Sequence, residues 1–316
     1  MTSLFEKRLI FVTGKGGVGK STVAAALGLM AARRGKRTIL CEVAQQERMS
    51  RFFHREGVGF EESELEPHLY AISIDPQKSM EEYFKLQVRL GPLNDLLFHN
   101  RFFQYFAAAT PGLKELLTIG KIWELAQLDR KVKHGAKYDP VIVDAPATGH
   151  GLGILKTPKT FANIAKVGPV RKQALAIDSF ITNTAVTGII AVTTPEEMPV
   201  NETVYLQEGL RTLLGLELNQ ILCNGLYPER FKKEEIKLLR DHYESSNGHS
   251  AEGTLMRAAL EAAASQGRRA NAQHQQVLRL KRGTGKPIVK LPFLFKPELG
   301  VSEFEELGIE LEAQLL

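Results

Sequence analysis

The first residues that could do chemistry form the stretch GKGGVGKST at positions 14–22. Its spacing fits the pattern G-x-x-x-x-G-K-[ST], in which glycines let the backbone curl so that N–H groups point at phosphate oxygens. Lys20 is placed to neutralise the β- and γ-phosphates of a nucleotide, and the Ser21 hydroxyl to bind Mg²⁺. The pattern predicts nucleotide contacts from Gly14, Lys15, Gly16, Gly17, Val18, Gly19, Lys20, Ser21 and Thr22.

A carboxylate that suits the same site comes much later in the chain. Asp144 ends the apolar run VIVD in the segment VIVDAPATGHG. An aspartate at the end of a buried strand is the group that holds Mg²⁺ beside such a loop. We therefore expect Ser21 and Asp144 to serve one metal ion.

The segments around these motifs alternate between short apolar runs and helical stretches. Leu9–Thr13 is predicted to be a buried strand that leads into the loop, and Ser21–Arg34 a helix that ends at Gly35. The order strand, loop, helix, strand opens a parallel α/β sheet, so the fold class is α/β, a P-loop NTPase with a mostly parallel sheet flanked by helices. Further predicted strands are Arg37–Val43, Leu69–Ile74, Val141–Val143, Ile189–Val192, Ile221–Cys223 and Ile288–Leu291, and further helices are Asn201–Leu214 and Lys232–Tyr243.

Two regions interrupt this alternation, at about 76–135 and 157–187, and both are helical in composition. We interpret them as insertions that form a helical cap on one face of the sheet. The chain has no low-complexity linker and no internal repeat, so residues 1–316 are predicted to be a single domain. Packing of the cap onto the sheet explains its apolar residues more simply than a groove for a hydrophobic helix does.

Two motifs resemble one family. GKGGVGKST is similar to the deviant Walker A loop of the MinD/ParA/ArsA-like ATPases, and DAPATGH resembles switch II of the arsenite-pump ATPase (ArsA) family. That family includes the ATPase that targets tail-anchored proteins. The resemblance implies catalytic roles for Lys15, Lys20 and Asp144, with Lys15 reaching the nucleotide of a second subunit, as an arginine finger does.

Weaker matches follow downstream. TPEEMPVNET resembles a family segment that would bring Glu196 to the nucleotide across the dimer. LCNGL places Asn224 where the family reads the adenine edge, and an amide can both donate to and accept from adenine. LPFLFKPELG implies that Pro292 and Phe293 flank the base.

The sequence departs from the family after the second strand, where it reads LCEVAQQERMSRFF. Alignment on M-S-x-x-F puts Ala44 in place of the aspartate that positions the attacking water. Glu42, Gln45 or Glu47 could replace it, since a glutamine suffices in some GTPases. Two interpretations stay open: one of these residues restores hydrolysis, or the protein binds ATP and hydrolyses it weakly beside a competent paralogue.

The chain has two cysteines, Cys41 and Cys223, each inside an apolar run. They are expected to be reduced core residues. No C-x-x-C pair is present, so the zinc site of the targeting ATPase is not expected. Two separated thiols also disfavour a metalloid site and an iron–sulfur cluster.

The distribution of charge indicates less about function than the motifs do. The net charge of +5 suits anionic ligands without requiring nucleic acid. Most charges between residues 257 and 290 are positive, which we interpret as a solvated helix face rather than a DNA-binding surface. The acidic end VSEFEELGIELEAQLL does not suit a membrane tether of the MinD kind. With a polar start and no long apolar run, we expect a soluble, cytoplasmic protein.

The sequence thus predicts a dimeric switch ATPase that uses ATP and Mg²⁺ and releases ADP. It would couple ATP binding and hydrolysis to a protein client or a membrane-protein partner. The alternatives are a weakly hydrolysing ATP-binding subunit of a hetero-oligomer, and the ATPase subunit of an arsenite-type anion exporter. Whether the dimer is formed by two identical chains or with a paralogue stays open.

Overall fold

The computed structural model describes residues 4–43, 47–87, 110–130, 137–245 and 251–315. Its strands are β1 (Leu9–Thr13), β2 (Thr38–Val43), β3 (Ser63–Glu66), β4 (Leu69–Ile74), β5 (Val141–Asp144), β6 (Thr187–Thr193), β7 (Gln220–Leu226) and β8 (Ile288–Pro292). They form one sheet in the order β3-β4-β2-β5-β1-β6-β7-β8. Every neighbouring pair is parallel except β3 and β4, which are antiparallel. The prediction of a mostly parallel α/β sheet is confirmed, while the antiparallel edge strand β3 was not predicted.

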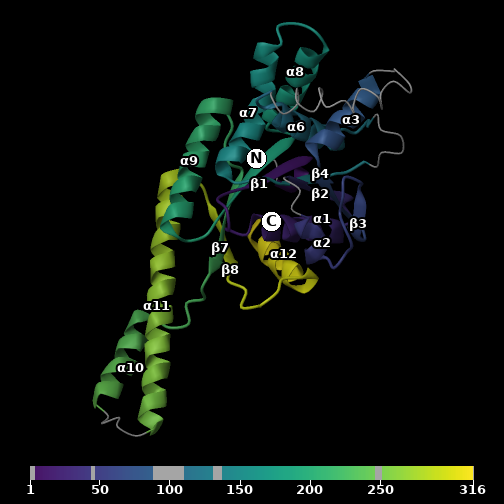
Figure 1. The fold of residues 1–316 in the computed structure, drawn as a ribbon. Coiled ribbons are helices and arrows are strands. Elements are labelled where there is room, and N and C mark those ends of the chain that lie inside the picture. Colours follow the sequence, from purple (N-terminus) through teal and green to yellow (C-terminus); the bar gives the residue numbers. More distant parts are fainter. Residues whose placement is uncertain (1–3, 44–46, 88–109, 131–136, 246–250, 316) are drawn as a thin grey trace.

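Helices cover both faces of the sheet (Figure 1). The helices are α1 (Lys20–Arg33), α2 (Arg48–Phe52), α3 (Pro76–Gln87), α6 (Leu113–Leu125), α7 (Thr148–Ile164), α8 (Pro169–Thr182), α9 (Glu197–Leu214), α10 (Lys233–Ser245), α11 (Ala251–Thr284) and α12 (Val301–Leu315), with a 3-10 turn at Leu4–Glu6. Helices α1, α2 and α12 pack on one face, and α6, α7, α8 and α9 pack on the other.

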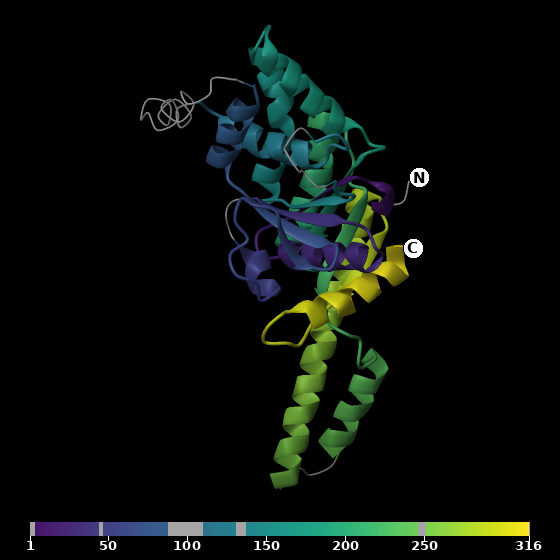
Figure 2. The ribbon, with the colours of Figure 1, turned by 90° about the vertical axis from the view of Figure 1, so that its right-hand side faces the viewer.

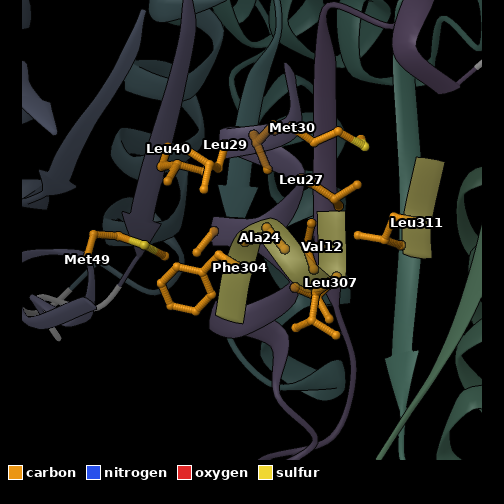
Figure 3. Packing of buried hydrophobic residues seen from close by; sticks show 14 of the residues in the cluster. Val12, Ala24, Leu27, Leu29, Met30, Leu40, Met49, Phe304, Leu307 and Leu311 are labelled. Atoms are coloured by element: carbon orange, nitrogen blue, oxygen red, sulfur yellow. The ribbon is translucent and has the colours of Figure 1, made fainter. Parts of the chain in front are cut away.

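The central strand β1 shows how the sequence supplies both cores. All five of its residues are buried. Because successive side chains of a strand point to opposite faces, Ile10 and Val12 join the core under α1 and α12, whereas Leu9 and Phe11 join the core under the opposite helices. Figure 3 shows the first of these cores, where Phe304 and other side chains of α12 meet those of α1. The phosphate-loop motif therefore follows a strand that is fixed on both sides.

The regions predicted to form a cap contain the helices α3 and α6, α8 and the second half of α7; these four helices lie together on one face of the sheet (Figures 1 and 2). Within the predicted insertion at 76–135, residues 88–109 and 131–136 lie outside the described part of the chain. Helix α7 begins at Thr148, nine residues before the predicted second insertion. The cap helix α7 thus starts directly after the loop that follows Asp144.

Helices α10 and α11 form a hairpin that projects away from the sheet (Figures 1 and 2). Helix α11 has 34 residues, and only its last part lies beside α9 and the strands β7 and β8. This hairpin was not predicted as an element of the fold. In the part of the chain that the structure describes, no helix combines the length and the apolar character that crossing a bilayer requires.

Candidate functional site

The loop between β1 and α1 has the backbone that its glycines permit. Gly14, Gly17 and Gly19 have φ values of 148°, 86° and 91°. A Cβ on Gly14 would lie 2.0 Å from the carbonyl oxygen of Val192 in β6. The loop therefore runs against the neighbouring strand at a distance that only glycine allows. This curled backbone between a buried strand and a helix N-terminus is what a phosphate cradle requires.

The structure brings Lys20, Ser21 and Asp144 together at the mouth of this loop. The Ser21 hydroxyl donates a hydrogen bond to Oδ2 of Asp144 at 2.5 Å. Asp144 ends β5 and lies in register with Val12 of β1. The ammonium group of Lys20 donates to the carbonyl oxygen of Lys15 at 3.0 Å, across the base of the loop.

Burial sets the electrostatics of this group. It raises the pKa of Asp144, against the hydrogen bond from Ser21 and the charge of Lys20, which both lower it. Burial also lowers the pKa of Lys20, against the attraction of Asp144. Both groups lose hydration in this position, so ligands of opposite charge would favour their ionised forms.

These residues fit a nucleotide with a divalent cation. The second oxygen of Asp144, Oδ1, is buried and has no hydrogen-bond partner among the described residues. Buried carboxylate oxygens are normally satisfied, and Mg²⁺ takes oxygen ligands directly or through water. Ser21 and Asp144 would hold the metal, and the glycine loop with Lys20 would hold the phosphates.

Lys15 does not extend into open solvent. Its ammonium group forms an ion pair with Glu202 of α9 in the same chain. The other carboxylate oxygen of Glu202 accepts a hydrogen bond from the Thr148 hydroxyl at 3.0 Å. Glu202 was not predicted as a site residue, although it lies in the segment TPEEMPVNET together with Glu196. Glu196 itself is exposed at the N-cap of α9.

Three residues were predicted as possible replacements for the water-positioning aspartate, and the structure describes the positions of two of them, Glu42 and Glu47. Ala44 and Gln45 lie outside the described residues. Glu42 is 1% exposed and sits across from Asp144 in the register of β2 and β5, and burial raises its pKa. Glu47 is exposed at the start of α2. Of these two carboxylates, Glu42 is therefore the one beside the predicted metal site.

The residues predicted for the base lie at the ends of β7 and β8. The side-chain amide of Asn224 donates to the carbonyl oxygen of Val18 at 3.0 Å, which links β7 to the phosphate loop. Pro292 ends β8, and Phe293 follows it with 41% of its surface exposed. The ring of Phe293 lies 5.1 Å from Tyr227 and 4.8 Å from Phe295, between ring centres. Tyr227 and Phe295 were not predicted as site residues, although the spacing F-L-F at 293–295 indicates aromatic side chains on one side of an extended segment.

Fold and loop together define a P-loop NTPase. A model of the anion-transporting ATPase (ArsA) family matches residues 7–173, which include both the loop and Asp144. The chain belongs to this family of ATPases.

Curated relatives agree with this assignment. The chain is 31% identical to "ATPase BagA" of Mycobacterium tuberculosis, over 72% of this chain and 68% of the relative. It is 26% identical to "Putative arsenical pump-driving ATPase 2" of Aquifex aeolicus, over 74% and 85%. It is 33% identical to "ATPase get3" of Schizosaccharomyces japonicus, over 47% and 43%.

Proposed function

We propose that the chain is a Mg²⁺-dependent ATPase that acts as a dimeric switch. The observation that carries this proposal is the meeting of Ser21 and Asp144 at 2.5 Å beside Lys20, at the mouth of a glycine cradle. Bound Mg²⁺ would supply charge neutralisation between the β- and γ-phosphates. Ser21 and Asp144 would hold the metal, and Lys20 would balance the phosphate charge.

The position of Lys15 supports the proposal of a dimer. Only five positions separate it from Lys20, and its ammonium points to Glu202 rather than into its own cradle. A lysine in this position serves the nucleotide of a facing subunit better than its own. Release from Glu202 would free Lys15 for that role, as an arginine finger supplied in trans.

Thr148 would couple the nucleotide site to the helix α7. This residue begins the cap helix α7 and also donates to Glu202. A change at the γ-phosphate that moves Lys15 or the segment after Asp144 would therefore alter the start of α7. Order changes of this kind beside a γ-phosphate are a common way to switch a surface.

The cap offers an apolar surface for a protein client. Four of its residues are exposed at the end of α7, in the connection to α8 and on α8, with exposed fractions between 45% and 84%; they are Ile164, Val167, Val170 and Leu175. Exposed apolar groups in one place favour a binding surface over simple packing. One relative is named a putative arsenical pump-driving ATPase, so a pump, which is a membrane protein, is the second candidate partner.

The cysteines weigh against arsenite as the transported species. Cys41 lies on β2 and Cys223 on β7, with β5, β1 and β6 between them. Both thiols are buried, and burial raises the pKa of Cys223 to about 12 and that of Cys41 further still. Metalloid binding by thiolates needs converging, ionised sulfurs, which these two positions do not provide.

A hydrolysis-deficient subunit of a hetero-oligomer is the second candidate function. It is favoured by the environment of Glu42, because one of its carboxylate oxygens already accepts two backbone N–H groups, from Arg48 and Met49. A carboxylate held in this way has less freedom to position water than the aspartate that Ala44 replaces.

The test is ATP turnover with Mg²⁺, measured beside ATP binding. We expect Lys20→Ala to lose binding, and Lys15→Ala to keep binding but lose turnover. Wild-type binding without turnover, with turnover gained in Ala44→Asp, would support the hydrolysis-deficient subunit instead. Absence of ATP binding by the wild-type chain would refute both functions.

A further inference from the structure

Arg48 is a charged residue at the phosphate loop to which the proposed function gives no role. Its guanidinium Nη1 donates a hydrogen bond to the Ser21 hydroxyl at 2.9 Å. Ser21 in turn donates to Asp144. Arg48 comes from α2, 27 positions along the chain from Ser21. A guanidinium group thus lies against the predicted metal ligand from outside the loop motif.

The backbone of Arg48 is fixed independently of its side chain. Its N–H donates to Oε1 of Glu42 at 2.6 Å, and the N–H of Met49 donates to the same oxygen at 3.2 Å. Glu42 is buried and lies in register with Asp144 on the neighbouring strand. The start of α2 is therefore attached to β2, next to the strand end that carries Asp144. Truncation of the arginine side chain would leave these backbone bonds intact.

The guanidinium group acts on the same groups that would bind a nucleotide. Burial is the main cause that lowers the pKa of Lys20, and the charge of Arg48 acts in the same direction. For Asp144 burial raises the pKa, while the hydrogen bond from Ser21 and the charges of Lys20 and Arg48 lower it. Two cations, Lys20 and Arg48, and two carboxylates, Asp144 and Glu42, therefore already share this region.

Arg48 also faces the space that a nucleotide would enter. A cavity of about 1130 Å³ lies between the phosphate loop, α2 and the start of α12. Its lining includes Gly19, Lys20 and Ser21 from the loop and Arg48 from α2. The arginine thus shares one open volume with the phosphate loop and is not separated from it by packed side chains.

We propose that Arg48 binds the terminal phosphate of the nucleotide in the same chain and so allows the site to distinguish ATP from ADP. The inference rests on the proposed function, because it takes ATP as the ligand. In P-loop NTPases the metal bridges the β- and γ-phosphates and is held by the loop serine. A group bonded to that serine lies at the γ end of the site. The planar fork of arginine donors matches phosphate oxygens. Arg48 can therefore give up its hydrogen bond to Ser21 and donate to the γ-phosphate instead.

The experiment compares Arg48→Ala and Arg48→Lys with the wild type by titration calorimetry in Mg²⁺. The probes are ADP and an ATP analogue whose γ-phosphate cannot be cleaved. Arg33→Ala is the matched control, because Arg33 is an exposed arginine at the far end of α1 that pairs with Glu305. We expect Arg48→Ala to weaken binding of the analogue about ten- to hundred-fold, the range for a hydrogen bond to a charged group. Binding of ADP stays within twofold, Arg48→Lys recovers part of the loss, and the control binds both ligands as the wild type does.

Three results would overturn the proposal while leaving ATP binding by the wild type established. They are an equal loss for both ligands, no loss for the analogue, and tighter binding of the analogue. The last would show that the guanidinium competes with the metal for Ser21. A wild-type chain that binds neither ligand would refute the proposed function itself.

Discussion

The ammonium group of Lys15 and the carboxylate of Glu202 form an ion pair within one chain, between the phosphate loop and α9. The hydrogen bond from Lys15 is the main cause that lowers the pKa of Glu202, with a further bond from Thr148 acting in the same direction. One carboxylate thus connects the phosphate loop, α9 and the first residue of α7. In the proposed dimer, Lys15 would have to leave this ion pair before it could reach the other subunit.

Substitution Glu202→Gln should make the ATP-bound dimer easier to form. The pair is partly exposed, with about a third of each side chain accessible, so its contribution is about 0.2–1 kcal/mol. We expect dimerisation in Mg²⁺ and a non-hydrolysable ATP analogue at a two- to fivefold lower protein concentration, measured by analytical ultracentrifugation. Thr148→Val, which keeps the ion pair, should not produce this shift. A higher concentration requirement in Glu202→Gln would contradict the idea that the pair restrains Lys15.

Two glycines of the loop should respond differently to alanine. Gly14→Ala places a Cβ 2.0 Å from the carbonyl oxygen of Val192, which is fixed in β6. We expect a loss of about 2–4 kcal/mol in the free energy of unfolding and loss of nucleotide binding, since neither backbone segment can move cheaply. Gly16→Ala meets no atom within 4 Å and needs no positive φ, so stability should change little. Chemical denaturation of both variants is the measurement, and equal stabilities would show that the close approach of Gly14 is not required.

Asn224→Ala should weaken nucleotide binding through the loop as well as through the base. The side chain donates to the carbonyl oxygen of Val18, so its removal leaves that loop carbonyl without this bond. A lost hydrogen bond of this kind costs about 0.5–1.5 kcal/mol, which corresponds to a roughly two- to tenfold weaker affinity. If Asn224 also reads adenine, the loss is larger for ATP than for GTP, which calorimetric titration with each nucleotide measures. Unchanged affinities for both would exclude either role.

The half-buried charge cluster beside β3 should make stability depend on pH. Arg130 pairs with Glu62 and Glu124, and Tyr138 donates to Glu62 at 2.7 Å. Burial raises the pKa of Glu62, but the bonds from Arg130 and Tyr138 outweigh it, so the pKa lies below its usual value. A lowered folded-state pKa stabilises the fold above the unfolded value of about 4.3, and this contribution is lost as the pH falls through the folded-state pKa.

The variant Glu62→Gln tests this dependence. We expect it to lower the free energy of unfolding by about 1–3 kcal/mol at pH 7, because Arg130 keeps only one of its two carboxylates. The difference from the wild type should shrink below about pH 4. Glu61→Gln, a change at the exposed neighbour, should stay within about 0.5 kcal/mol at every pH. A difference between Glu62→Gln and the wild type that does not vary with pH would show that its charge is not the cause.

The parts of this protein that the sequence predicted are those that local patterns encode. Apolar runs marked seven of the eight strands, and the spacing of the loop motif was enough to locate Lys20 and Ser21. The strand β3, with the sequence SELE, has no apolar run, and only its pairing with β4 makes it a strand. The contact of Arg48 with Ser21 likewise joins residues far apart in the chain, and no local pattern of residue types distinguishes Arg48 from the nearby Arg51.

The hairpin of α10 and α11 is long and is attached to the rest of the molecule at one end, so a small rotation there would be enlarged at its other end. A helix of 34 residues is about 50 Å long. The C-terminal part of α11 is held to the rest of the molecule, where Gln273 bonds to the backbone of Tyr227 and Gly225 and Arg279 pairs with Glu197 at the start of α9. Helix α9 also carries Glu202, five residues after Glu197. A tilt of α11 by about 5° at Gln273 would move the far end of the helix, about 33 Å away, by about 3 Å. Under the proposed function, a small shift of Lys15 that moves Glu202 and α9 would therefore become a larger displacement at the far end of the hairpin.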